Sequence, residues 1–113
     1  MYKNIILSIF MCFFCSWSNT DSVREITYIG FHVTDWLQTR QGISMGMKEL
    51  NPILGEHPSV GKIDTIVGLS LMGHILISGL LPKPYRATFQ YVTIGIESGT
   101  VIHNYNAGVR IEF

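Results

Sequence analysis

Polar side chains recur at helical spacing along the segment from Pro84 to Gly108. They fall within one narrow arc of a helix, which Gly108 closes, whereas every other face is apolar or aromatic. Such a helix is stable only if its apolar faces meet lipid, and its polar arc must then face other helices. The pattern therefore predicts a membrane helix whose polar arc points into a bundle. The arc consists of Arg86, Gln90, Thr93, Glu97, Thr100 and Asn104.

A helix is also predicted between Glu25 and about Met47. Ser22 is predicted to cap it, because Glu25 lies at the spacing of a capping box. The polar residues of this helix gather toward one side and the opposite side is apolar, so it spans a membrane only if other helices cover its polar side. These polar residues are His32, Asp35, Gln38 and Thr39.

The segment from Val60 to Leu81 is the clearest candidate for a membrane-spanning helix. It has enough apolar length, at 1.5 Å per residue, to cross a hydrocarbon core of about 30 Å. His74 lies near its middle. Either Ser59 caps this helix or Pro58 is its first residue. The tight corner at residues 81–84 predicts that this helix and the next are antiparallel neighbours.

The N-terminal residues 1–18 have the features of a secretory signal sequence. An apolar run from Ile5 to Phe14 follows a basic residue, and the segment 16–18 supplies small residues at a cleavage position. The expected outcome is cleavage after Ser18, with retention as an anchor as the alternative. Cys12 and Cys15 lie inside the apolar run, so they are predicted to be apolar filler, without a redox or zinc role.

Composition also indicates a membrane protein. Charged residues make up 14% of the chain and hydrophobic residues 47%, which is unlike the mixed-charge surface of a soluble domain. Eight basic residues balance eight acidic ones without a basic cluster, so nucleic acid is not an expected partner. The prediction is an all-α membrane protein in which residues 19–113 form one domain: three transmembrane helices in an antiparallel bundle after a signal sequence or anchor.

Two short patterns carry a resemblance to a known family. The residues are Asp35 and Thr39 in Asp-x-x-x-Thr, and Glu49, Asn51 and Pro52 in Glu-x-Asn-Pro. With them, the chain from residue 34 to residue 113 resembles a family of small uncharacterised membrane proteins of Gram-negative bacteria and their phages. The resemblance implies the same topology and a structural corner at Glu-x-Asn-Pro, closed by Gln38 or Asn104, but no activity.

The polar residues expected to gather inside the bundle form the candidate site. Glu97 is expected to pair with a group on one of the other helices, for which His74 is the candidate, and Arg86 is expected to reach lipid headgroups. No HExxH or Glu-x-x-His pair accompanies the histidines and acids, so neither a metal nor a cofactor is predicted. The candidate residues are His32, Asp35, Gln38, Thr39, Glu49, Asn51, His74, Arg86, Gln90, Glu97 and Asn104.

Three functions are compatible with this pattern, and no catalytic motif decides between them. The first is association in the bacterial inner membrane with itself or with another membrane protein. The second is an intramembrane enzyme or lipid-headgroup binder, and the third is a holin-like pore. Direct packing of Asp35, His74, Arg86 and Glu97 would favour the first function, whereas a cavity lined by them would favour the second.

Overall fold

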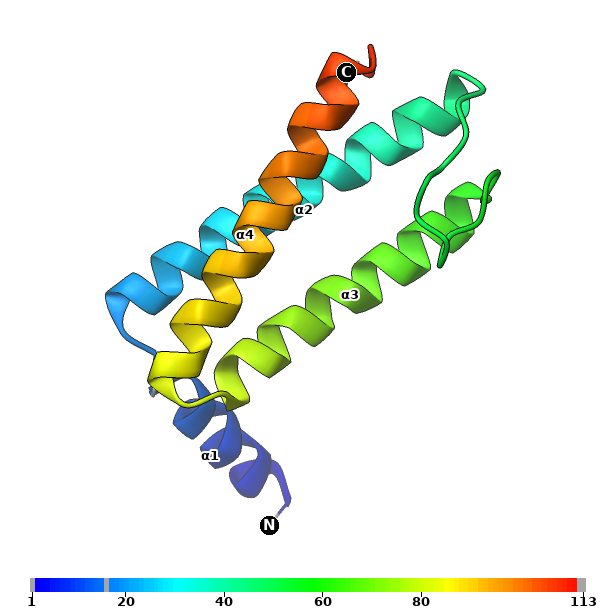
Figure 1. The fold of residues 1–113 in the computed structure, drawn as a ribbon. Coiled ribbons are helices and arrows are strands. Elements are labelled where there is room, and N and C mark those ends of the chain that lie inside the picture. Colours follow the sequence, from blue (N-terminus) through cyan, green and yellow to red (C-terminus); the bar gives the residue numbers. More distant parts are fainter. Residues whose placement is uncertain (1, 16, 112–113) are drawn as a thin grey trace.

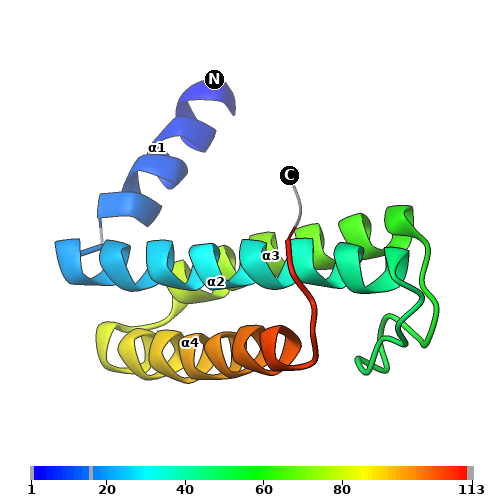
Figure 2. The same ribbon diagram turned by 90° about the horizontal axis from the view of Figure 1, so that it is seen from above.

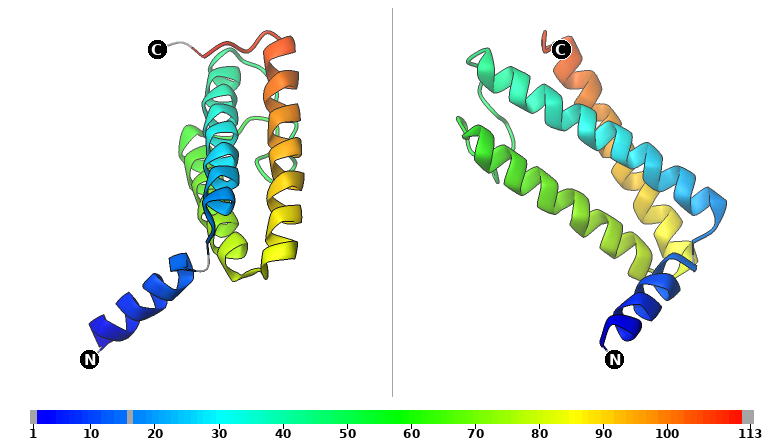
Figure 3. Two further views of the ribbon diagram at one scale, coloured as in Figure 1. Left: turned by 90° about the vertical axis from the view of Figure 1, so that its left-hand side faces the viewer. Right: turned by 180° about the vertical axis from the view of Figure 1, so that it is seen from behind.

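The computed structural model describes residues 2–15 and 17–111, including the side chains of residues 2–9 and 17–111. These residues form four helices and no strand, which confirms the all-helical prediction (Figure 1). The helices are α1 (Tyr2–Cys15), α2 (Asn19–Ser44), α3 (Val60–Leu80) and α4 (Lys83–Asn106). Helices α2, α3 and α4 form a bundle, from which α1 projects away (Figures 2 and 3). The two cysteines of α1 lie outside the described side chains.

Helix α2 begins at Asn19, so the sequence prediction of a start near Glu25 was wrong. The cap is Ser18, whose Oγ accepts a hydrogen bond from the Asp21 backbone N at 3.1 Å. The Asp21 carboxylate in turn accepts from the Ser18 backbone N at 2.9 Å, which completes a capping box. Because the helix starts earlier, Glu25 lies in its interior and is free to face the other helices.

Replacing Ser18 with alanine is expected to lower the free energy of unfolding by about 1 kcal/mol, because one backbone donor of α2 loses its acceptor. The matched change Ser22→Ala should have little effect, since Ser22 does not cap the helix. Both values can be measured by circular dichroism during titration of detergent micelles with sodium dodecyl sulfate. Equal losses in the two variants would contradict this assignment of the cap.

Helices α3 and α4 agree closely with their predicted ranges. Ser59 caps α3, since its Oγ accepts from the Lys62 backbone N at 3.1 Å, and this decides between Ser59 and Pro58. Pro82 is the N-cap of α4. The two helices meet at this corner and diverge toward the other end of the bundle (Figures 1 and 3). Helix α2 runs antiparallel to α3 and packs along α4.

Within the described part of the chain, α3 is the one helix long and apolar enough to cross a membrane. Only 22% of its apolar stretch is buried inside the protein, unlike the core helix of a soluble protein. Helices α2 and α4 do not meet this criterion, because each carries too many charged and polar side chains. The hydropathy of the described helices therefore does not support the prediction of three transmembrane helices.

The bundle has an inverted distribution of polar and apolar side chains. Among the described residues, the buried polar side chains outnumber the buried hydrophobic ones, eight to four. Large apolar side chains on all three helices are exposed instead, including Ile26, Leu76 and Ile96. The buried polar residues are Asp21, Glu25, His32, Gln38, His74, Ser78, Arg86 and Gln90. Helix α4 therefore turns its polar arc into the bundle, as predicted.

Candidate functional site

Arg86 anchors a polar cluster at the end of the bundle where α3 turns into α4. Its side chain is buried, with 2% of the residue exposed. The guanidinium donates to the Asp21 carboxylate at 3.0 Å and to the backbone carbonyls of Ser78 at 2.6 Å and Leu81 at 3.1 Å. It also lies over the Trp17 ring. The expectation that Arg86 reaches lipid headgroups was therefore wrong, because Asp21 and the corner backbone satisfy it inside the protein.

A second buried pair of polar side chains, Glu25 and His74, follows one turn further along α2. His74 Nδ1 lies 2.6 Å from Glu25 Oε1, and His74 Nε2 lies 2.7 Å from the Thr93 hydroxyl. Gln90 donates to the other Glu25 oxygen at 2.8 Å. His74 bonds to Glu25 and not to Glu97, so the predicted pair between His74 and Glu97 does not form.

Aromatic rings enclose the His74 imidazole within the bundle. Its ring stacks on Tyr28 at a centroid distance of 3.4 Å and on Phe89 at 4.6 Å. The Tyr28 hydroxyl lies 3.1 Å from His32 Nδ1. The stacked rings separate the hydrogen bonds of His74 from those of His32, so the polar interior consists of two clusters.

Glu97 pairs with a residue of another helix, as predicted. Its partner, however, is His32 of α2 and not His74. His32 Nδ1 lies 3.0 Å from Glu97 Oε1, and His32 Nε2 lies 3.0 Å from the Val67 carbonyl. A carbonyl only accepts, so Nε2 carries a proton, and the contact at Nδ1 requires a proton on either the imidazole or the carboxyl group. The second oxygen, Glu97 Oε2, is buried and has no hydrogen-bond partner.

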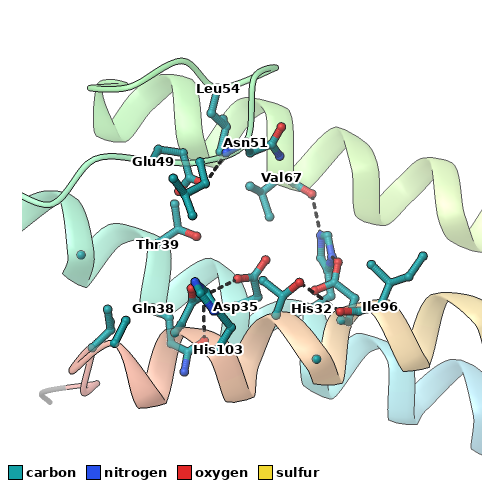
Figure 4. A pocket seen from close by; sticks show the side chains of 18 of the residues that line it. His32, Asp35, Gln38, Thr39, Glu49, Asn51, Leu54, Val67, Ile96 and His103 are labelled. Carbon is teal, nitrogen blue, oxygen red and sulfur yellow. Dashed lines mark hydrogen bonds and ion pairs between the residues drawn. The ribbon is translucent and has the colours of Figure 1, made fainter.

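A cavity of about 790 Å³ opens beside this pair. It lies between the diverging helices and the segment 45–59 that connects α2 to α3, and it reaches Tyr28 and His32 near the middle of α2. Figure 4 shows the side chains of the connecting segment facing those of α2 and α4 across this space. The polar side chains that line it include His32, Asp35, Gln38, Thr39, Glu49, Asn51, Ser70, Glu97, Thr100, His103 and Asn104.

Hydrogen bonds between α2 and α4 hold one wall of the cavity. Asn104 Nδ2 donates to Asp35 Oδ1 at 3.0 Å and to Gln38 Oε1 at 3.2 Å. The Gln38 amide donates in turn to the Val101 carbonyl at 3.2 Å. These bonds hold the Asp35 carboxylate in position at this wall of the cavity.

The Glu-x-Asn-Pro corner forms the opposite wall and is closed by its own residues. Glu49 Oε1 accepts from the Asn51 backbone N at 2.9 Å, and Asn51 Oδ1 accepts from the Ile53 backbone N at 3.0 Å. The closure by Gln38 or Asn104 that the resemblance implies is not seen, because those two side chains bond to each other. Both nevertheless line the same cavity as the corner.

The candidate residues therefore separate into two groups. Eight line the cavity, while three, His74, Arg86 and Gln90, are packed into the bundle without facing it. The sequence prediction missed Asp21, Glu25 and Tyr28, although they continue the spacing of His32 and Asp35 toward the N-terminus of α2. Extending that polar face backward from His32 by about three turns identifies them, but the predicted start of the helix was too late.

The described histidine and acidic side chains do not gather into one group. Among the described side chains, no group of three His, Cys, Asp or Glu residues could hold a metal ion. His74 packs against Glu25 on one side of the stacked rings, whereas Asp35 and Glu97 lie in the cavity on the other.

No protein-family model matches the chain, and neither a curated protein nor a solved structure is similar to it.

Proposed function

We propose that the protein is a small integral membrane protein of the bacterial inner membrane whose lateral cavity binds the polar group of a small molecule or lipid. In this proposal α2, α3 and α4 all cross the membrane. The observation that carries the function is the polar cavity beside Glu97. Of the four residues named at the outset, Asp35 and Glu97 line the cavity, which favours a headgroup binder, whereas His74 and Arg86 are packed directly inside the bundle.

The inverted distribution of side chains supports three spanning helices. Helices α2, α3 and α4 contain 26, 21 and 24 residues, so each is at least about 30 Å long at 1.5 Å per residue. Their exposed apolar side chains would form an extensive patch in water but match the hydrocarbon core. Hydropathy counts every polar residue as a cost, whereas here most of them are paired inside the bundle.

The size and position of the cavity support a binding role. Its volume lies in the range of roughly 300–1,000 Å³ that holds small molecules in proteins. It runs from the polar connecting segment to the middle of the bundle, between α3 and α4 where they diverge. A headgroup can therefore be held among the polar residues while an attached acyl chain remains in lipid.

Filling the cavity tests this function. Gly99 lines it, and a Cβ atom there would meet nothing within 4 Å. Gly99→Leu is therefore expected to fold normally, to gain helix propensity, and to reduce bound lipid at least tenfold. The measurement is native mass spectrometry of delipidated protein mixed with short-chain phosphatidylethanolamine and phosphatidylglycerol.

Gly30→Leu on α2 is the matched control. Gly30 is also exposed with no atom within 4 Å of a Cβ, but it does not line the cavity. Lipid binding should therefore match that of the wild type. If Gly99→Leu keeps its bound lipid, or if both variants lose it equally, the cavity is not the binding site.

Association in the membrane is the second candidate, and one observation favours it. Gly95 and Gly99 are exposed on α4 at a spacing of four residues, which lets helices approach closely in lipid. The same mass spectra report oligomeric state, so a dimer lost in Gly99→Leu would support this alternative. A pore between subunits has less support, because the polar arc of α4 is already used within one chain.

A further inference from the structure

The cavity carries an excess of negative charge. Three carboxylates line it, those of Asp35, Glu49 and Glu97. Among the described lining residues, the one lysine or arginine is Lys48, which is mostly exposed and whose ammonium lies 3.7 Å from Glu56. Among the described lining residues, carboxylates therefore outnumber lysine and arginine side chains three to one.

His32, which could neutralise one of these carboxylates, is already engaged within the protein. Its Nε2 faces the Val67 carbonyl, and its Nδ1 lies beside both Glu97 Oε1 and the Tyr28 hydroxyl. Asp35 accepts one amide hydrogen bond from Asn104 and forms no ion pair.

Glu97 shows most directly what is missing. Its Oε2 atom is buried without a hydrogen-bond partner, although Glu97 lines the cavity. Leaving a buried carboxylate oxygen unpaired is costly, since desolvation is then uncompensated. A ligand with a positively charged N–H group in the cavity would offset the charges of Glu97 and Asp35 at the same time.

We propose that the ligand carries an organic ammonium group, held between Glu97 and Asp35. This inference rests on the proposed function and adds the chemical class of the ligand. The volume of the cavity suits an organic cation, whereas a metal ion lacks three converging ligands among the described side chains. The ammonium group belongs either to the headgroup of a lipid or to a free amine.

The experiment compares three probes by native mass spectrometry of the full chain. These are short-chain phosphatidylethanolamine, short-chain phosphatidylglycerol and phenethylammonium. Wild-type protein is expected to bind phosphatidylethanolamine at least tenfold more tightly than phosphatidylglycerol. Glu97→Gln and Asp35→Asn should each weaken phosphatidylethanolamine about tenfold without changing phosphatidylglycerol. Each change keeps the shape of the side chain and a hydrogen bond to its neighbour, and circular dichroism checks that each variant folds.

Asp64→Asn is the control, because Asp64 is a carboxylate of α3 that contacts Trp36 and Arg40 outside the cavity. It should leave binding of every probe unchanged. Binding of phosphatidylethanolamine alone assigns the ammonium group to a lipid, and competition by phenethylammonium assigns it to a free amine; both support the inference.

Three results would overturn the inference. Equal affinity for the two lipids, with both lost in Gly99→Leu, would refute the ammonium class while leaving the proposed function in place. An effect of Asp64→Asn as large as that of Glu97→Gln would show that total charge controls binding, without a role for the cavity. Binding of no probe at all would refute the proposed function together with its ligand class.

Discussion

Replacing Arg86 with methionine is expected to lower the free energy of unfolding by about 3 to 5 kcal/mol, the largest loss for any single change in the bundle. The guanidinium is almost fully buried and donates to Asp21 and to backbone carbonyls at the corner between α3 and α4. Methionine keeps much of the volume but leaves these acceptors unpaired. The loss can be measured by circular dichroism during titration with sodium dodecyl sulfate.

A surface ion pair provides the control for this prediction. Arg40 lies 3.6 Å from Asp64, and about half of its side chain is exposed, at 47%. Arg40→Met should therefore cost about 0 to 1 kcal/mol. A loss below about 1 kcal/mol in Arg86→Met would show that Arg86 is not a buried anchor.

The second large effect is expected at the other buried pair. His74→Phe should destabilise the bundle by about 2 to 3 kcal/mol. Phenylalanine preserves the stacking on Tyr28 and Phe89, but Glu25 then loses its imidazole partner at 2.6 Å. The same detergent titration measures this loss. Because the ring stacking is kept, the loss reports the contact between Glu25 and His74.

A double variant sharpens this second test. Combining His74→Phe with Glu25→Leu removes both polar partners, and replacing both is much less costly than removing one. The double variant should therefore be more stable than His74→Phe alone. His57 is exposed in the connecting segment, so His57→Phe should change stability by less than about 0.5 kcal/mol. If His57→Phe and His74→Phe have equal effects, Glu25 and His74 are not energetically coupled.

Helical periodicity explains which parts of the fold could be predicted. The spacing of Arg86, Gln90 and Glu97 places them on one face whatever the rest of the chain does, and this face does point inward. The apolar length of α3 and the cap at Ser59 are local properties too. The start of α2 was missed because Ser18 and Ser22 both precede an acid at capping-box spacing.

The partners of the inward-facing groups could not be predicted in the same way. Glu97 meets His32 across 65 positions of the chain, and His74 meets Glu25 across 49. A shift of one helical turn between two helices would exchange these partners without changing any local pattern. The prediction of a pair between Glu97 and His74 failed because it required the register between α3 and α4, which the sequence does not specify locally.

The sequence by itself determined that this protein has an inverted helical bundle with one clearly apolar helix and a polar arc on α4. Those properties depend on residue spacing within single helices, at 3.6 residues per turn. Only the tertiary structure decided that Arg86 and His74 are structural anchors, whereas Asp35 and Glu97 line a cavity. The physical reason is that α3 and α4 diverge from their corner, so polar groups near the corner are packed together and those beyond it are separated by space.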